Sequence, residues 1–279
     1  MTRSVWFITG ASTGLRRALA EAVLAAGDRV LATARDPASL DDLTGPHRDD
    51  VVRLRLDVTD PVQVHAAAQE AIRRAGGIDV LVNNAGHGLI GALEELSDAQ
   101  IRAVLDTNVL GVLTVTRAVL PHMRARRRGH IVQLSSVGGV VATPGHALYG
   151  MSKSALEGMS EALAGEVAPL GIRLTIVEPG PFRTGFTGRS MRFAEPIDDY
   201  RDTPAGRLRK TFSQQDGAQP YDPARAAAAI IRAVHDDTSP LRLPLGPEAV
   251  RRIRDKLQRQ LADLEAWEAV SVDTRYPGS

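Results

Sequence analysis

A tyrosine and a lysine stand four residues apart in the segment Tyr149-Gly-Met-Ser-Lys153, at the start of a helical pattern. This spacing places both side chains on one face of a helix. A free tyrosine has a pKa of about 10, so proton transfer near neutral pH requires that the phenolate be stabilised by roughly 4 kcal/mol. A nearby ammonium group supplies part of that stabilisation. The chain uses arginine almost everywhere, with Lys153, Lys210 and Lys256 as its lysines, so a lysine at 153 indicates a need for a compact charge.

Two further polar residues have positions that suggest a role in the same chemistry. Ser136 lies thirteen residues before Tyr149, where the fifth predicted strand ends, and presents a hydroxyl there. Asn108 lies midway along a long helical pattern, although asparagine is a poor helix former. Together with the tyrosine and the lysine, they predict a site for proton transfer to or from an oxygen.

The elements that must position these residues alternate between short β-rich runs and longer helical patterns, which is typical of a parallel sheet with crossover helices. We predict strands at Val5–Thr9, Arg29–Thr33, Val51–Leu56, Val80–Asn83, His130–Leu134, Arg173–Val177 and Leu241–Leu243. We predict helices at about 14–26, 60–75, 98–127, 147–168 and 222–236. The predicted fold is an α/β, doubly wound Rossmann-type sheet of seven parallel strands with helices on both faces, in one domain over residues 1–279.

The turn after the first strand has the composition of a phosphate site. The run Thr9-Gly-Ala-Ser-Thr-Gly14 separates a strand from a helix. Glycines let the backbone approach a diphosphate, whose charge the N–H groups and dipole of the helix stabilise. At the end of the second strand, where NAD-specific folds place an acid, the chain has Ala34 and Arg35. A guanidinium pairs with a 2′-phosphate, so NADP(H) is favoured over NAD(H), and the neighbouring Asp36 weakens this inference.

The third and fourth strands also end in polar or small residues. Asp57 closes the third strand and Asn83-Asn-Ala-Gly86 the fourth. Both lie at carboxyl ends of strands, where open parallel sheets bind ligands. We therefore expect them near the same ligand as the glycine turn.

Composition and charge exclude several classes of function. The net charge is +1, from 34 basic and 33 acidic residues, so there is no global field for nucleic acid or an anionic membrane. The basic run at 124–128 closes a helical pattern, and we expect Gly129 to cap that helix. The absence of cysteine excludes disulfides and thiolate metal sites. No export signal or apolar run of membrane-spanning length is evident, and we expect a cytoplasmic protein without a metal.

Two segments depart from the regular alternation. Residues 185–220 form a polar, irregular insertion that carries Phe186, Met191, Phe193 and Phe212, and such insertions are often lids over a site. Residues 247–270 place an apolar stripe on one helical face. We expect that stripe to pack on this domain or on a partner subunit, in a homodimer or homotetramer.

Taken together, these residues resemble the short-chain dehydrogenase/reductase family, in its branch of shorter single-domain enzymes, over nearly the whole chain. The resemblance implies that Tyr149 is the general acid/base, that Lys153 lowers its pKa and holds the nicotinamide ribose, and that Ser136 orients the substrate oxygen. It also implies that Asn108 holds a water that links Lys153 to solvent. The cofactor-binding residues that it implies are Gly10, Ser12, Thr13, Gly14, Leu15, Arg35, Asp57, Val58, Asn83, Ala85, Gly86, Tyr149, Lys153, Pro179, Gly180 and Thr184. Among them, Asp57 and Val58 would meet adenine, and Pro179, Gly180 and Thr184 would line the nicotinamide.

The expected activity is the interconversion of a small carbonyl compound and an alcohol with NADP(H). One departure leaves an alternative open, because Arg16 stands where the family has a third glycine. A long side chain there is expected to crowd the contact between helix and sheet and to weaken NADPH binding, which would fit a catalytically silent nucleotide-binding protein. His87 and His146 are expected to be loop histidines near the pocket. The substrate is set by the variable segment and is not readable from the sequence.

Overall fold

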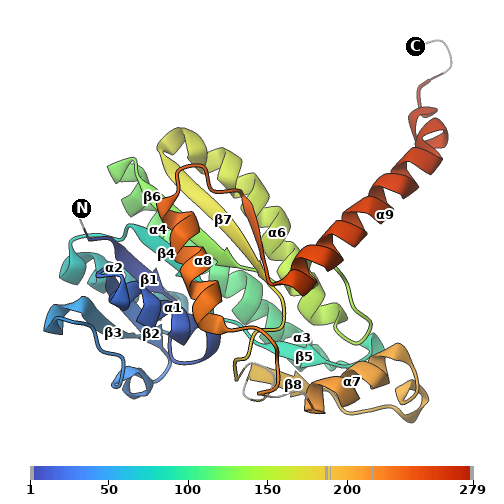
Figure 1. The fold of residues 1–279 in the computed structure, drawn as a ribbon, viewed down its shortest axis with the longest axis horizontal. Helices are drawn as coiled ribbons and strands as arrows, with labels where there is room; N and C mark the ends of the chain where they lie inside the picture. The colour runs from blue at the N-terminus through green and yellow to red at the C-terminus, as the bar shows by residue number, and fades with distance from the viewer. Residues whose placement is uncertain (1–2, 186–187, 189, 215–216, 277–279) are drawn as a thin grey trace.

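A computed structural model describes residues 3–185, 188, 190–214 and 217–276, and its centre is a parallel sheet of seven strands (Figure 1). The strand order is β3-β2-β1-β4-β6-β7-β9, which reverses direction beside β1 as a doubly wound fold requires. The strands are β1 (Val5–Ile8), β2 (Arg29–Ala34), β3 (Val51–Arg55), β4 (Val80–Asn83), β6 (Gly129–Leu134), β7 (Ile172–Pro179) and β9 (Arg242–Leu245). The predicted fold is confirmed.

The strands are apolar on both faces because helices cover both sides of the sheet. In β1, Trp6 and Ile8 point into one core, and Val5 and Phe7 point into the other. All four are buried. A strand buried on two sides reads as a continuous apolar run rather than an alternating one, which explains the sequence signal.

The helices form two layers. Helices α1 and α8 pack on one face of the sheet, and α2, α4 and α6 cover the other. The helices are α1 (Gly14–Ala25), α2 (Pro61–Ala75), α3 (Asp98–Leu105), α4 (Gly111–Arg126), α5 (Val137–Val140), α6 (Ala147–Val167), α7 (Pro204–Gln214), α8 (Pro223–His235) and α9 (Pro247–Val272). The bounds of α1, α2, α6, α8, α9 and of the stretch formed by α3 and α4 lie close to the sequence predictions, whereas α5 and α7 were not predicted.

Helices α3 and α4 form one long helical stretch joined by a π-helical turn over Asp106–Leu110. Within the described residues, Asp98–Arg126 is the one helix long and apolar enough to meet a composition test for a membrane span. Its apolar residues Val115, Val119 and Met123 are buried against the sheet. Packing in the core therefore accounts for its composition.

The end of α4 differs from the sequence prediction. Arg127 caps the helix in the left-handed conformation, with φ 52°, and Gly129 begins β6 instead. A Cβ at Gly129 would come within 2.6 Å of Met123 Sδ, so this glycine is needed for space. Arg126 and Arg128 each donate a hydrogen bond to Asp79 Oδ1 at 2.7 Å. Much of the basic run thus serves structural contacts.

The segment 185–220 is more regular than its composition indicates. It contains β8 (Met191–Phe193), which pairs in parallel with β5 (Gly88–Ile90), and then α7. Met191 is buried, and the pairing with β5 holds its strand against the loop after β4. Phe186 lies outside the described residues.

Candidate active site

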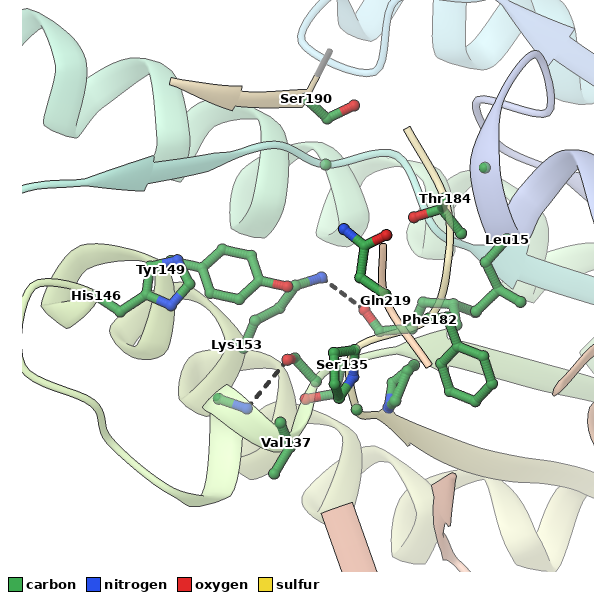
Figure 2. Close-up of a pocket in the computed structure, with 18 of the residues that line it drawn as sticks. Leu15, Ser135, Val137, His146, Tyr149, Lys153, Phe182, Thr184, Ser190 and Gln219 are labelled. Carbon is green, nitrogen blue, oxygen red and sulfur yellow. Dashed lines mark hydrogen bonds between the residues drawn. The ribbon is translucent and has the colours of Figure 1, made fainter. Parts of the chain in front are cut away.

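A cavity of about 450 Å³ opens at the carboxyl ends of four strands. Residues that follow β1, β4, β6 and β7 form its floor, and α7 and the base of α9 add side walls. In Figure 2, His146 and Tyr149 lie at one end, and Leu15 and Thr184 at the other. Ten of the predicted residues line it: Thr13, Gly14, Leu15, Gly86, Ser136, Tyr149, Lys153, Pro179, Gly180 and Thr184.

Tyr149 and Lys153 share one face of α6, as their spacing predicts, and both are buried. The Lys153 Nζ lies 5.8 Å from the centroid of the Tyr149 ring. It donates a hydrogen bond to the Leu134 carbonyl at 2.7 Å. The ammonium is therefore anchored to the end of β6, near the phenol.

Ser136 is the N-cap of α5, and its Oγ accepts a hydrogen bond from Gly138 N at 3.0 Å. The same hydroxyl and the Tyr149 ring both border Gly138, where a Cβ would lie 3.5 Å from Ser136 Oγ and 3.5 Å from Tyr149 Cε1. Gly139 permits the close approach of α5 and α6, because a Cβ there would lie 3.1 Å from the Lys153 backbone carbon. The structure thus brings together the serine, the tyrosine and the lysine predicted from the sequence.

The electrostatic balance at the phenol differs from the simple expectation that Lys153 lowers its pKa. Burial raises the pKa of Tyr149 above its ordinary value, while the nearby Ser136 hydroxyl and the charge of Arg16 oppose that rise. Burial lowers the pKa of Lys153 to about 8; Arg16 lowers it further and Glu157 raises it. The phenol is accordingly protonated at neutral pH in this state.

Asn108 is fully buried in the π-helical turn, and its side-chain amide is engaged. Its Oδ1 accepts from His87 N at 3.0 Å, and its Nδ2 donates to the His87 carbonyl at 2.9 Å and to Ser152 Oγ at 3.1 Å. A Cβ at Gly86 would lie 3.1 Å from Asn108 Oδ1 and 3.8 Å from Lys153 Nζ. Asn108 therefore lies close to the lysine and holds the loop after β4 in place.

A stripe of buried polar residues continues behind Lys153 along α6 and the two strands beneath it. Glu157 and Ser160 follow the lysine on the same helical face, and Gln133 and Glu178 are on the sheet. Arg242 of β9 approaches both carboxylates, with its Nε 3.3 Å from Glu157 and 3.7 Å from Glu178. Burial and the neighbouring Glu157 raise the pKa of Glu178 to about 7.

The glycine turn after β1 has the geometry expected of an anion site. Gly10 and Gly14 have φ of +65° and +66°, in the left-handed region that favours glycine. Thr9 Oγ1 accepts hydrogen bonds from Asn84 N at 2.9 Å and Ala85 N at 3.1 Å. This contact ties the turn after β1 to the turn after β4, on the two sides of the switch point.

Arg16 lines the cavity, whereas the sequence predicted its side chain to lie in the contact between helix and sheet. Its Nη1 donates to the Gly10 carbonyl at 3.4 Å and its Nη2 to the Gly86 carbonyl at 3.2 Å. The expectation that this side chain crowds the contact between helix and sheet is therefore wrong, because the guanidinium turns into the cavity. Burial lowers the pKa of Arg16 to about 10, and its two acceptors are neutral carbonyls. It is a cation at the place where the two turns meet.

Several predicted cofactor residues lie outside the cavity lining. Asn83 donates to Thr116 Oγ1 at 2.8 Å, so its side chain serves the contact with α4. Asp57 Oδ1 accepts from Thr59 N and Oγ1, and Val58 packs against Gly111. The remaining residues outside the lining are Gly10, Ser12, Arg35, Ala85 and Asn108.

Arg35 extends from the end of β2 and is exposed. The neighbouring Asp36 caps a short turn, and its Oδ1 accepts from Ala38 N at 3.1 Å. This carboxylate therefore caps its own turn, and Arg35 lies beside it at the surface.

The far end of the cavity holds residues that sequence reasoning left out of the site. His146 stacks on Tyr149 with ring centroids 4.8 Å apart and meets Phe212 of α7 edge-on at 5.2 Å. Burial lowers the pKa of His146 to about 4, so the ring is neutral. From the base of α9, Arg252 donates to Thr143 Oγ1 at 2.9 Å. The sequence signal for His146 was its position three residues before Tyr149. No local signal indicated that α9 contributes a side chain to the cavity.

The cavity fits the phosphate end of a nicotinamide dinucleotide. Thr13 is the N-cap of α1 and, among the described residues, its side chain makes no capping hydrogen bond, so the first N–H groups of the helix remain for a ligand. A Cβ at Gly14 would lie 3.4 Å from Thr184 Cβ, so the passage between them is narrow. The cavity volume is within the usual range for small-molecule sites.

Comparisons with known proteins agree with this geometry. Residues 4–194 match the family model described as short chain dehydrogenase. The oxidoreductase BOA17 of Botryotinia fuckeliana is 38% identical over 96% of this chain and 98% of its own. A solved short-chain dehydrogenase from Streptomyces avermitilis is 43% identical, with a TM-score of 0.91, over 99% of this chain and 100% of that chain.

Two more distant structures contain nicotinamide cofactors. A short chain dehydrogenase from Burkholderia cenocepacia in complex with NADP is 28% identical, with a TM-score of 0.72, over 97% of this chain and 98% of that chain. A 3-ketoacyl-(acyl-carrier-protein) reductase from Brucella melitensis complexed with NADH is 25% identical, with a TM-score of 0.73, over 87% of this chain and 96% of that chain. These neighbours support a nicotinamide cofactor without choosing between its two forms. The parallel sheet and the family match together show that this chain belongs to the short-chain dehydrogenase/reductase family of oxidoreductases.

Proposed function

We propose that this chain is an NADP(H)-dependent oxidoreductase that interconverts a ketone or aldehyde and an alcohol, with Tyr149 as the general acid/base. The observation that carries this proposal is that Tyr149 and Ser136 line the same cavity, with the Lys153 ammonium held nearby by the Leu134 carbonyl. The substrate is a small molecule, and neither nucleic acid nor a membrane is needed. The cytoplasmic location remains a prediction from the sequence.

In the reducing direction, the Tyr149 hydroxyl donates its proton to the substrate oxygen while the Ser136 hydroxyl holds that oxygen in place. A nicotinamide bound in this cavity would supply the hydride that the carbonyl carbon accepts. One hydride and one proton convert the carbonyl to the alcohol. The raised pKa of Tyr149 keeps the phenol in the protonated form that this direction requires. Lys153 would hold the nicotinamide ribose, and its compact ammonium suits that contact.

The choice of NADP(H) over NAD(H) rests on the end of β2. Arg35 is exposed there, position 34 is an alanine, and Asp36 is committed to its own turn. A guanidinium at this position would pair with a 2′-phosphate.

The surroundings of Tyr149 indicate the class of substrate. Phe212 and the neutral His146 offer apolar surface to the substrate, which favours a carbonyl group on an apolar molecule.

The decisive experiment is Tyr149→Phe, assayed with NADPH and a panel of ketones and aldehydes. We expect turnover to fall to near background and the NADPH dissociation constant to stay within a few-fold, since the hydroxyl serves proton transfer. Tyr200→Phe is the matched control, because Tyr200 donates to Glu94 at the surface. Substantial turnover in Tyr149→Phe would overturn the mechanism.

A catalytically silent nucleotide-binding protein is the second candidate, and the observation that favours it is the presence of Arg16 where the family turn has a third glycine. Titration of NADPH fluorescence, combined with the substrate panel, separates the two. Binding without turnover on any carbonyl compound would support the silent protein.

A further inference from the structure

Most of helix α9 has no packing partner among the residues that the structure describes. Its first two turns pack on α5 through Ala249 and Ile253, and the helix then leaves the body of the molecule (Figure 1). From Leu257 to Val272 every residue is exposed. These sixteen residues span about 24 Å of helix. A helix of this length is marginal in water by itself, so its stability calls for packing that the single chain does not provide.

The exposed part carries an apolar stripe on one face. Leu257, Leu261 and Leu264 recur at the four- and three-residue spacing of a helix seam, and each is more than half exposed. Trp267 lies at the edge of the same face and is 65% exposed. Solvation of three leucines and a tryptophan in a row is unfavourable, which marks this face as an interface.

The charges on α9 are divided between its two halves. Residues 251–259 contain five basic side chains (Arg251, Arg252, Arg254, Lys256 and Arg259) and one acidic side chain, Asp255. Residues 260–273 contain four acidic side chains (Asp263, Glu265, Glu268 and Asp273) and no basic one. The dipole of a helix favours the opposite order, so the helix itself does not explain this division. Among the described residues, the one ion pair on α9 is Arg252–Glu248, at its base.

We propose that α9 pairs in antiparallel orientation with α9 of a second copy of this chain, around a two-fold axis near Leu261. Aligning Leu257 with Leu264 of the second copy places residues 251–259 opposite residues 262–270. Each basic half then faces an acidic half, and the leucines form a shared seam. An isologous contact of this kind closes after two copies.

The charge pattern favours a second copy over the other occupants of such a face. A parallel pair would place like charges beside each other along its whole length. An anionic membrane would attract the basic half and repel the acidic half. Only the antiparallel arrangement complements both halves with the same sequence.

Cross-linking of single cysteines tests the proposal, because the natural chain has none. Gln260→Cys lies beside the seam near the proposed axis, and Ser271→Cys lies on the same face at the far end. In the antiparallel pair the two copies of residue 271 are about 30 Å apart along the axis. A short bismaleimide should therefore convert most of the Gln260→Cys protein to twice the chain mass and leave Ser271→Cys uncross-linked.

Charge variants in the Gln260→Cys background test the pairing rule. Arg254→Glu with Lys256→Glu and Arg259→Glu gives an acidic helix, and Asp263→Lys with Glu265→Lys and Glu268→Lys gives a basic one. Each variant alone should lose the cross-link, and a mixture of the two should restore it as a heterodimer. The restored product also shows that both variants remain folded.

Three outcomes would overturn the proposal. One is a Gln260→Cys protein that stays uncross-linked, and another is a Ser271→Cys protein that cross-links equally well, which indicates a parallel pair. The third is co-flotation of an uncross-linked chain with vesicles of phosphatidylserine and phosphatidylcholine, which would assign α9 to a membrane surface.

Discussion

Replacement of Arg16 by glycine restores the residue usual at this position of the family turn, and we expect it to weaken NADPH binding. The guanidinium is a buried cation whose acceptors are two neutral carbonyls at 3.4 and 3.2 Å. Both contacts are near the long limit for hydrogen bonds, and we assign each of them about 0.5 kcal/mol. A diphosphate that passes over the glycine turn would offer a charged acceptor, and such bonds contribute about 1.5–3 kcal/mol each.

The exchange of two long contacts for one charged contact leaves a net gain of about 0.5–2 kcal/mol from Arg16, which corresponds to roughly 2- to 30-fold in the dissociation constant. Arg16→Gly should therefore bind NADPH roughly 2- to 30-fold more weakly than the parent protein. Arg16→Gln should resemble it, because glutamine retains length and polarity but no charge. The difference should shrink as ionic strength rises, since salt screens the contact.

Titration of NADPH fluorescence at two salt concentrations measures these constants for the three proteins. Thermal unfolding without cofactor controls for the conformational cost of a glycine in the first turn of α1. Equal or tighter binding by Arg16→Gly would refute this reasoning. It would mean that the side chain obstructs the cofactor, as the sequence alone suggested.

Three further predictions concern the proposed site and its surroundings. Lys153→Arg should lose most turnover despite its conserved charge, because a planar fork does not fit the buried space beside the Leu134 carbonyl; turnover near that of the parent would contradict this. Ala34→Asp with Arg35→Ala should shift the ratio of kcat/KM from NADPH toward NADH, and equal efficiency with both cofactors in the parent would refute the role of Arg35. Because the pKa of Glu178 is raised to about 7 in the folded protein, its proton is favoured by folding and the free energy of unfolding should fall as pH rises from 5 to 8. Denaturant unfolding should show that this decrease between pH 5 and 8 is about 2 kcal/mol larger in the parent than in Glu178→Gln. Parallel pH profiles of the two proteins would count against it.

The layers of the fold were predictable because their signals are local. A strand buried on both faces needs a continuous apolar run, and a helix on a sheet needs apolar residues at three- and four-residue spacing. The same holds for Tyr149 and Lys153, whose four-residue separation places them on one face in any helix. The glycine turn after β1 was readable for a similar reason, because the positive φ of Gly10 and Gly14 is a property of the backbone at those residues.

The surroundings of the tyrosine were not predictable, because they come from distant parts of the chain. Phe212 of α7 reaches the ring stack of His146 and Tyr149, and Arg252 of α9 closes the same end of the cavity. The π-helical turn that holds Asn108 lies within a pattern that reads as ordinary helix. Its position depends on hydrogen bonds to the loop after β4 and to α6.

The sequence by itself determined which residue types stand at the ends of which strands, and hence the class of chemistry. Only the tertiary structure decided where the long and polar side chains point. Arg16 spans to the carbonyl of Gly86, seventy residues away, and Asn83 turns toward α4 rather than the cavity. The physical reason is that backbone elements follow from neighbours within a few residues. The direction of a flexible side chain follows from whichever partner, near or far in sequence, lies within hydrogen-bond reach.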